Sequence, residues 1–296
     1  MDISSAGLRV LRQIAESGSF TAAAARLGYT QSAVSRQAAA LEQAAGAALF
    51  ERRRNGVRLT PAGLTLLRHG RTILDALATA ERELAGAAPK AEVVRLGAVL
   101  SAGAAFLPGA LRRLAQADPQ ITVTTREGTT PGLMRALRAG SIDLALLTSR
   151  PPHRPSDGES PRLRFETVED TDLVVAAPSI GEFAGRTSVH VDELVDAAWI
   201  ATPSSRSEPL LGVWPGLPGR PHVVHSARDW LTKTQLVAAG LGVTTVPRRL
   251  APVLPPGVTL LNVEGAPPEI RRVHLARLPG TPTPAITAVT RALTSG

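Results

Sequence analysis

A cluster of hydrogen-bonding side chains opens an otherwise alanine-rich stretch, TQSAVSRQAAALE, at residues 30–42. Glutamine can form paired hydrogen bonds with adenine, arginine can do so with guanine, and serine can bond to bases or phosphates. These residue types therefore indicate recognition of a nucleic acid, although a solvated helix face would also explain them. The polar side chains of the cluster are Gln31, Ser32, Ser35 and Arg36.

Side chains that read DNA need a helix whose other face is anchored in a core. Val34, Ala38 and Leu41 recur at helical spacing and predict that buried face. Thr30 is the predicted N-cap, because its hydroxyl can accept a hydrogen bond from a free backbone N–H of the first turn. Gly46 is the predicted end of the helix, at about residue 45.

The preceding segment, FTAAAARLG, predicts a second helix and a tight turn. It begins at Phe20, with Thr21 as the predicted N-cap, and Gly28 ends it. Ala24 lets the helices approach, Gly28 makes the turn and Val34 fills the crevice, as in a helix-turn-helix. In that unit the N-terminal end of the second helix enters the DNA major groove. An earlier predicted helix carries Leu8, Leu11, Ile14 and Ala15.

The next segment, LFERRRNGVRLTPAG, predicts a β-hairpin. Asn55-Gly56 is a strong hairpin signal between short strands at residues 49–52 and 57–60. Beside a helix-turn-helix, a basic hairpin indicates a wing that grips the phosphate backbone and contributes affinity more than sequence specificity. Taken alone, such a charge run would fit a solvated loop. The arginines of the predicted wing are Arg52, Arg53, Arg54 and Arg58.

A long helix follows, with Thr60 as N-cap and Pro61 at its first position, and it runs to about Ala85. One apolar stripe along it favours pairing with a second copy of the chain. The alternative is packing of this stripe onto its own domain. The segment AGAAPK at residues 85–90 is the predicted linker. The predicted dimerisation residues are Leu67, Leu74, Leu77 and Leu84.

The stretch from SGSF to TPAG, residues 17–63, resembles the N-terminal signature of the LysR-type transcriptional regulators. The resemblance implies a winged helix-turn-helix, a dimerising linker helix and a two-lobed effector domain similar to periplasmic solute-binding proteins. It also implies a homodimer or homotetramer that binds double-stranded operator DNA and a small-molecule effector. RNA polymerase is a further candidate partner.

The predicted fold class is therefore α/β, with parallel-rich sheets in the effector domain. The predicted DNA-binding domain covers residues 1–60, and the linker helix covers 61–88. The effector domain covers 89–296. Its predicted lobe I comprises residues 92–161 and 268–296, and its lobe II comprises 162–267.

Strand and helix patterns alternate after residue 92, and Arg150–Pro161, rich in turn-forming residues, is the predicted crossing between the lobes. Ligands of such sheets bind beyond the carboxyl ends of the strands. The resemblance places effector contacts at hydroxyl-bearing residues near those ends, which implies an organic acid or amino-acid-like effector rather than an uncharged one. Each hydroxyl could instead be a helix N-cap. The candidate effector-binding residues are Ser101, Thr129, Thr130, Thr148, Thr202 and Ser204.

Composition and motifs exclude several other classes. The chain has no cysteine, so disulfides, zinc–thiolate sites and thiol redox sensing are excluded. Its net charge of +8 fits a nucleic-acid partner, although genomic base composition would also explain the many arginines. Neither a secretory signal nor an apolar run of about 18 residues is present, which predicts a cytoplasmic protein with no membrane association.

No catalytic motif is recognisable, so an enzyme is not expected and no cofactor is predicted. His222 and His225 would point to opposite faces of a strand, which makes them poor metal ligands, and no metal site is predicted. The alternatives left open are an effector-independent DNA-binding repressor and, less favoured, a solute-binding protein or an enzyme.

Overall fold

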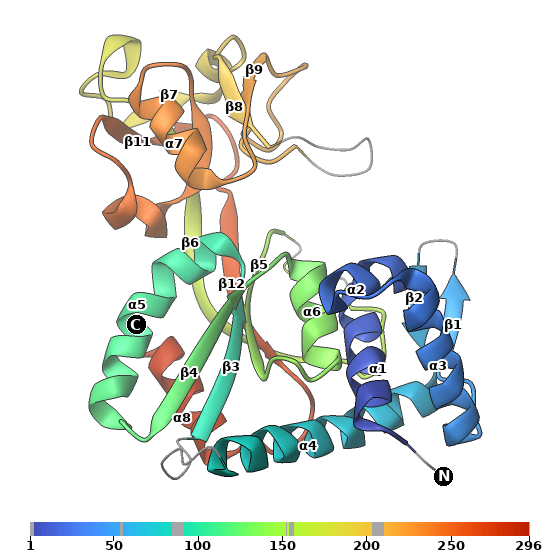
Figure 1. The fold of residues 1–296 in the computed structure, drawn as a ribbon. Helices are drawn as coiled ribbons and strands as arrows, with labels where there is room; N and C mark the ends of the chain where they lie inside the picture. Colours follow the sequence, from blue (N-terminus) through green and yellow to red (C-terminus); the bar gives the residue numbers. More distant parts are fainter. Residues whose placement is uncertain are drawn as a thin grey trace.

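The computed structural model describes residues 3–53, 56–84, 92–151, 153, 157–202 and 210–295. Its first part is a three-helix unit followed by a hairpin (Figure 1). The elements are α1 (Ser5–Ser17), α2 (Phe20–Leu27), α3 (Gln31–Ala45), β1 (Phe50–Arg53) and β2 (Gly56–Leu59).

The helices of this unit begin where a side-chain hydroxyl can cap them. Thr30 Oγ1 accepts a hydrogen bond from the Ala33 N–H at 3.2 Å, which confirms the predicted cap of α3. The cap of α2 is Ser19 rather than Thr21, and it accepts from the Ala22 N–H at 3.4 Å. Thr21 lies inside the first turn because the extended backbone conformation typical of an N-cap occurs at Ser19.

The core of the unit contains most of the predicted residues, and it also contains Val10, which was not predicted. Val34 and Ala38 of α3 pack with Val10 and Ile14 of α1 and with Ala24 of α2. Their burial leaves the opposite side of α3 exposed. The hairpin closes the unit, with the ring of Phe50 packed at a tilt against that of Phe20, 5.6 Å between ring centroids.

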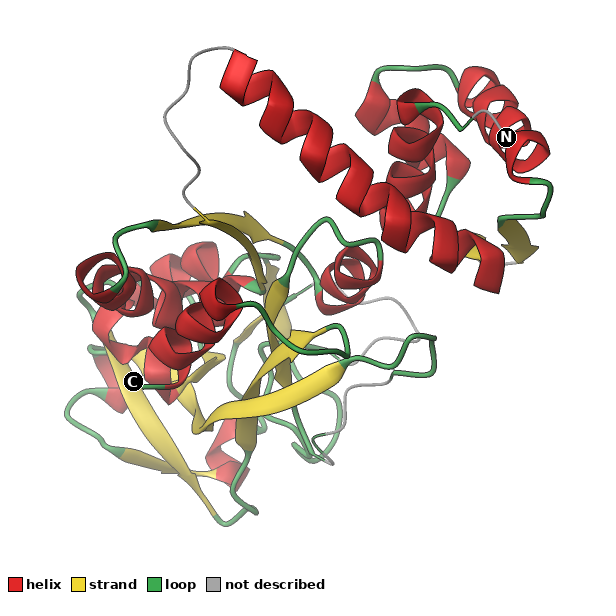
Figure 2. Ribbon diagram, turned by 90° about the horizontal axis from the view of Figure 1, so that it is seen from below, coloured by secondary structure: helices red, strands yellow, loops and turns green. Residues whose placement is uncertain are grey.

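Helix α4 (Pro61–Leu84) leaves the hairpin as a single long rod (Figure 2). Thr60 caps it as predicted, with its hydroxyl accepting from the Gly63 N–H at 3.1 Å. The helix runs along the N-terminal unit and along the first lobe of the effector domain (Figure 1).

The first lobe is built on three parallel strands in the order β4-β3-β5. Their carboxyl ends point toward the second lobe (Figure 1). The elements are β3 (Glu92–Ala98), α5 (Leu100–Ala117), β4 (Ile121–Glu127), α6 (Thr130–Arg138), β5 (Leu144–Ser149) and the C-terminal α8 (Pro284–Thr294).

Two antiparallel strands, β6 (Arg164–Pro178) and β12 (Ile270–Arg277), connect the lobes. The first half of β6 pairs with β12, while Leu173 to Ala177 pair with strands of the second lobe. The chain therefore crosses within β6, not in the breaker-rich segment at residues 150–161. A strand can serve both lobes in this way because it hydrogen-bonds to different neighbours along its length.

The second lobe is smaller and irregular. Its elements are β7 (Ser188–His190), β8 (Trp199–Ala201), β9 (Val223–Ser226), α7 (Trp230–Ala238), β10 (Thr244–Pro247), β11 (Val258–Glu264) and 3₁₀ turns at Gly181–Phe183, Val191–Leu194 and Arg248–Val253. The lobe I strands β4, β3 and β5 are parallel as predicted, and antiparallel pairing of β6 with β10, β11 and β12 makes the large sheet as a whole mixed.

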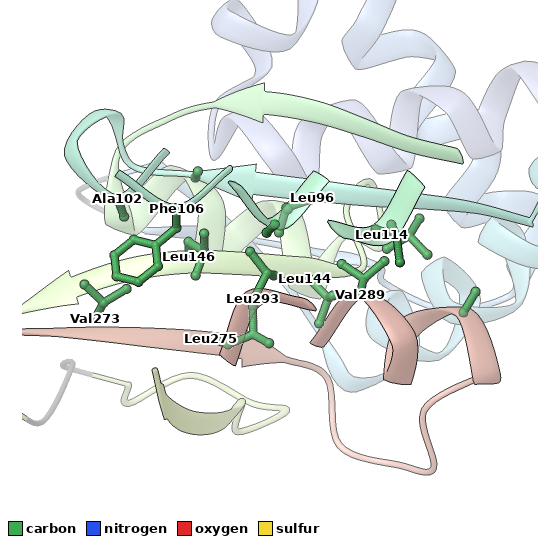
Figure 3. Packing of buried hydrophobic residues seen from close by; sticks show 14 residues of the cluster. Leu96, Ala102, Phe106, Leu114, Leu144, Leu146, Val273, Leu275, Val289 and Leu293 are labelled. Atoms are coloured by element: carbon green, nitrogen blue, oxygen red, sulfur yellow. The ribbon is translucent and has the colours of Figure 1, made fainter. Parts of the chain in front are cut away.

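Each lobe has its own buried core. In lobe I, Leu96 of β3 and Leu146 of β5 pack beneath Phe106 of α5 and Leu293 of α8 (Figure 3). In lobe II, Trp199 is fully buried and its indole N–H donates to the Leu194 carbonyl at 3.1 Å. None of the helices in the described residues is long and apolar enough to span a membrane.

Candidate nucleic-acid interface and effector site

The outer edge of α3 carries the predicted base-reading side chains. Gln31, Ser32 and Arg36 are exposed and Ser35 is half-buried. The Gln31 side-chain amide donates to Ser35 Oγ at 2.9 Å, and Thr30 Oγ1 shares a hydrogen bond of 3.0 Å with Ser32 Oγ. These contacts order the side chains of Gln31, Ser32 and Ser35 at the start of the helix, where free backbone N–H groups also lie.

One residue of this edge was not predicted. Tyr29 lies in the turn immediately before the capping Thr30 and is 52% exposed. It is the only tyrosine of the chain. Its position between Gly28 and Thr30 was the available sequence signal. An aromatic residue in this turn does not belong to the buried face of either helix, so its exposure could have been predicted.

The hairpin is attached firmly to the end of α1. The Val57 N–H donates to the Gly18 carbonyl at 2.8 Å. A side chain at position 56 would place its Cβ 2.5 Å from that carbonyl oxygen, so only glycine allows this approach. Gly56 pairs with Arg53 in the hairpin.

Of the four predicted wing arginines, the structure describes the side chain of Arg58 alone. Arg58 is exposed and lies 3.0 Å from Glu159 of the effector domain. Arg54, and the side chains of Arg52 and Arg53, lie outside the described residues.

The predicted dimerisation stripe divides into two parts. Leu67 and Leu74 are buried by the chain itself, and Leu67 packs with Leu11 and Leu41. Leu77 is 39% exposed and Leu84 is 89% exposed. The alternative of packing onto the chain's own domains thus accounts for the first two leucines, and Leu77 and Leu84 remain available to a partner.

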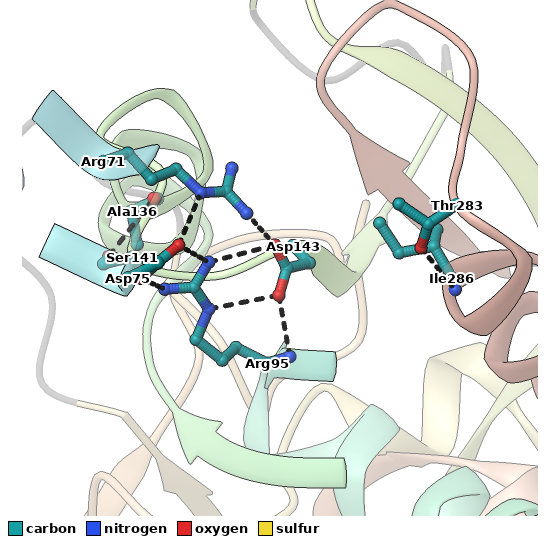
Figure 4. A network of polar contacts seen from close by, with 8 residues as sticks. All are labelled: Arg71, Asp75, Arg95, Ala136, Ser141, Asp143, Thr283 and Ile286. Atoms are coloured by element: carbon teal, nitrogen blue, oxygen red, sulfur yellow. Dashed lines mark hydrogen bonds and ion pairs between the residues drawn. The ribbon is translucent and has the colours of Figure 1, made fainter. Parts of the chain in front are cut away.

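Ion pairs hold α4 against lobe I. The guanidinium groups of Arg71 and Arg95 converge on the buried carboxylate of Asp143 (Figure 4). Arg95 Nε lies 3.1 Å from Asp143 Oδ2, and Asp75 of α4 also contacts Arg95 at 3.2 Å. Burial opposes ionisation of Asp143, but the hydrogen bonds from Arg95 and the charge of Arg71 outweigh it and lower the pKa of the carboxyl group.

The lobe I hydroxyls gather where predicted, at one edge of the sheet. Ser101 is the second residue of α5, whose N-cap, Val99, supplies no side-chain hydrogen bond. Thr129 caps α6 and accepts from the Gly132 N–H at 3.3 Å, with the half-buried Thr130 as the first helical residue. Thr148 is the penultimate residue of β5. The N-cap alternative therefore accounts for Thr129.

Lobe II contributes a buried cation that was not predicted. Lys233 of α7 is only 7% exposed, and its ammonium group donates to Thr202 Oγ1 at 2.7 Å. Burial lowers the pKa of Lys233 to about 8, although the charge of Asp229 opposes the shift. The rarity of lysine in this arginine-rich chain was the available signal. Ser204 lies outside the described residues.

The buried histidine His274 has a structural hydrogen bond. Its Nε2 lies 2.8 Å from Ser149 Oγ. Burial, together with the charges of Arg272 and His153, lowers the pKa of His274. No group of three histidine, aspartate or glutamate side chains is placed to hold a metal ion in the part of the chain that the structure describes.

Two family models together match almost the whole chain. The model described as the LysR substrate binding domain matches residues 87–296. The model described as the bacterial regulatory helix-turn-helix protein, lysR family, matches residues 6–64. A hydrogen peroxide-inducible genes activator from Mycobacterium avium is 31% identical over 252 residues, covering 84% of this chain and 79% of that protein.

Solved structures share the fold. A full-length OxyR variant from Pseudomonas aeruginosa has a TM-score of 0.60 at 23% identity, covering 99% of this chain and 98% of that one. Full-length CbnR complexed with its target DNA has a TM-score of 0.57 at 22% identity, covering 99% of each chain. On the two family matches, this chain belongs to the LysR family of transcriptional regulators, with an N-terminal helix-turn-helix and a C-terminal effector-binding domain.

Proposed function

We propose that this regulator reads its operator with the edge of α3 formed by Gln31, Ser32, Ser35 and Arg36. The wing arginines Arg52, Arg53, Arg54 and Arg58 would hold the phosphate backbone. The observation that carries this proposal is the burial of Val34, Ala38 and Leu41 on one side of α3, which leaves the polar edge facing solvent. The structure of CbnR with its target DNA supports DNA as the partner of this shared fold.

Operator binding can be tested without knowing the operator in advance. Mapping the sites that the protein occupies across the host genome yields bound fragments for quantitative gel-shift titration. We expect Arg36→Ala to weaken binding strongly and the matched control Arg112→Ala, on the exposed face of α5, to leave it unchanged. Equal binding by both variants would contradict the assignment of α3 as the reading helix.

The same proposal assigns a function to each of the three segments of the chain. Residues 1–60 bind DNA, the helix at 61–88 pairs two copies, and 89–296 bind the effector. Leu77 and Leu84 are the residues of α4 that would contact the second copy, since Leu67 and Leu74 are already covered. A homodimer, or a homotetramer of two dimers, presents two reading helices to a dyad-symmetric operator.

For the effector we propose a small organic acid. Lys233 is a buried ammonium group with a single hydroxyl partner, Thr202, among the described residues. A buried charge is costly unless an opposite charge neutralises it, so this site favours a carboxylate over a neutral ligand. Ser101, Thr129, Thr130, Thr148 and Ser204 are the hydroxyl-bearing candidates for the remaining contacts.

The name of the Mycobacterium avium relative refers to hydrogen peroxide. A response through thiol oxidation is not available to this chain, which has no cysteine. An effector held by non-covalent contacts in a cleft between the two lobes, beside Lys233, is therefore the mechanism that fits these residues.

The effector class can be tested by thermal-shift screening of metabolites, with each carboxylate compared with its amide. We expect stabilisation by one or more carboxylates and none by the matched amides. Lys233→Met should abolish this response while Ser141→Ala, remote from the cleft, retains it. Stabilisation by an amide, or a response that survives Lys233→Met, would contradict the proposal.

A further inference from the structure

A cavity lies between the DNA-binding unit and lobe I, away from the effector site proposed at Lys233. Its volume is about 1060 Å³. One side is formed by α1, the hairpin and the start of α4, and the other by α6 and the segment Gly158–Ser160. Ligand sites favour such junctions between domains, where a concave space need not be cut into one core.

The walls of this interdomain cavity are mixed, with an apolar side next to the charged groups of Glu51, Arg58, Arg135, Arg138 and Glu159. Ile14 and Leu67 come from the DNA-binding side, and Ala139 from α6, and all three are almost fully buried. Val57 and Leu64 are half-buried and complete the apolar lining. An apolar ligand group would therefore lose water contacts on several sides at once, which is the main source of affinity in such sites.

The charged groups around the cavity are not equally paired. Arg138 contacts both Asp157 and Glu159, and Glu159 also pairs with Arg58. Arg135 has no carboxylate partner among the described residues. Its Nε donates to the Glu16 backbone carbonyl at 3.2 Å, and its terminal nitrogens have no hydrogen-bond partner within the described part of the chain.

We propose that this interdomain cavity is a second small-molecule site, for a ligand with an apolar body and one acidic group. The acidic group would bind the terminal nitrogens of Arg135, and the apolar body would lie against the half-buried Val57, Leu59 and Leu64. A guanidinium binds a carboxylate through two parallel hydrogen bonds, which also fixes the ligand's orientation.

Occupancy of this site would act on DNA binding through the wing. Val57 and Arg58 belong to the hairpin and line the cavity beside Glu159 of the effector domain. A ligand that bridges the two sides stabilises their docked arrangement, in which Arg58 is paired with Glu159 instead of a phosphate. By linkage, operator DNA and this ligand would then weaken each other's binding.

Photolabelling of the full chain tests the site directly. The probe is 4-benzoylbenzoate, an aromatic carboxylate that forms a covalent bond with nearby C–H groups on irradiation. We expect the label in peptides that contain residues 14–18, 57–67 or 135–139, as identified by mass spectrometry. Arg135→Met should reduce labelling there about tenfold, as for loss of a charge-assisted hydrogen bond. The matched control Arg112→Met should not change it.

Two further samples separate this site from the effector cleft and from loss of folding. Ala15→Trp should fill the cavity and block labelling, and far-ultraviolet circular dichroism checks that both variants are folded. Lys233→Met should leave labelling intact, even though it abolishes the effector response proposed above. Labelling spread over the surface and indifferent to Arg135→Met and Ala15→Trp would overturn the proposal. Labelling confined to lobe II and lost in Lys233→Met would also overturn it.

Discussion

Arg58 of the hairpin and Glu159 of the effector domain form an ion pair of 3.0 Å, so an arginine predicted to hold DNA is paired within the chain. The two side chains are 55% and 37% exposed. An exposed pair of this kind is worth about 0–1 kcal/mol, which a DNA phosphate can outcompete. The pair therefore acts as a weak competitor of operator binding.

Removing that competitor should strengthen DNA binding. We expect Glu159→Gln to raise operator affinity by up to about fivefold at low salt, which corresponds to the upper end of an exposed pair's energy. The matched control Glu264→Gln, on the second lobe, should change nothing. Arg58→Gln should lower the slope of log affinity against log salt by about 0.9, the value for one phosphate contact. An unchanged slope would show that Arg58 does not touch a phosphate.

Arg36 offers a test of base reading as opposed to phosphate binding. If its guanidinium reads a guanine, Arg36→Ala should cost about 1–3 kcal/mol at one base pair and relax discrimination there. The measurement is a gel-shift series in which each operator base pair is replaced in turn. Equal weakening across all replacements would instead assign Arg36 to the phosphate backbone.

The DNA-binding unit was predictable from sequence because its determinants are local. Val34, Ala38 and Leu41 recur at helical spacing, and a capping threonine and an ending glycine bound the helix. The cap of α2 was predicted two residues too late. Ser19 and Thr21 carry equivalent hydroxyl groups, and only the path of the chain into the helix distinguishes them.

The effector domain was harder to predict because its boundaries depend on distant partners. The first half of β6 is largely polar and exposed, so it gave no strand pattern, and its assignment comes from pairing with β12 about a hundred residues later. The burial of Lys233 likewise depends on packing around α7. The contact of Arg71 with Asp143 joins residues 72 positions apart, which no local pattern reveals.

Asp143 should make stability depend on pH in the acid range. Because the folded pKa of Asp143 is lowered, its contribution is fully present above the ordinary aspartate value of about 3.9 and is lost as pH falls through the folded value. Asp143→Asn should lower the free energy of unfolding by about 3 kcal/mol at neutral pH, as for breaking a buried pair. The same substitution should also reduce the dependence of the free energy of unfolding on pH below about pH 4.

Denaturant titration at several pH values measures both effects. The exposed aspartate in Asp196→Asn serves as the control and should leave the pH dependence intact. A variant Asp143→Asn with wild-type stability at neutral pH would show that the ion-pair cluster between α4 and lobe I contributes nothing to the folded state.

Lys233 should give the effector response its own pH dependence. Its pKa of about 8 means that the free protein carries the charge below this pH and loses it above. Affinity for a carboxylate effector should therefore be constant below pH 8 and fall as pH rises further, by up to about tenfold per unit. Calorimetric titration across this range measures it, and Lys233→Arg, which stays charged, should abolish the dependence if it still binds.

The lowered pKa of Lys233 has the opposite effect on the stability of the effector-free protein, which should increase as pH rises. Between pH 8 and the ordinary lysine value of 10.5, the unfolded chain holds a proton that the folded chain has released, so stability rises with pH in this window. Lys233→Met should remove that rise and should increase Tm at neutral pH, because it removes a buried charge. A lower Tm for Lys233→Met would show that the ammonium group is already satisfied in the free protein.

The exposed end of α4 should determine the oligomeric state. Leu84 is 89% exposed and Leu77 is 39% exposed, whereas Leu67 is 3% exposed within its own core. Leu77→Glu combined with Leu84→Glu should therefore convert the oligomer to monomers without lowering the free energy of unfolding of the monomer. Leu67→Ala should lower the free energy of unfolding by about 2–5 kcal/mol, but the variant should remain oligomeric at temperatures below its unfolding transition. Light scattering measures the mass and thermal unfolding the stability. Monomers from Leu67→Ala, together with an intact oligomer from the double variant, would place the dimer interface elsewhere than on this end of the helix.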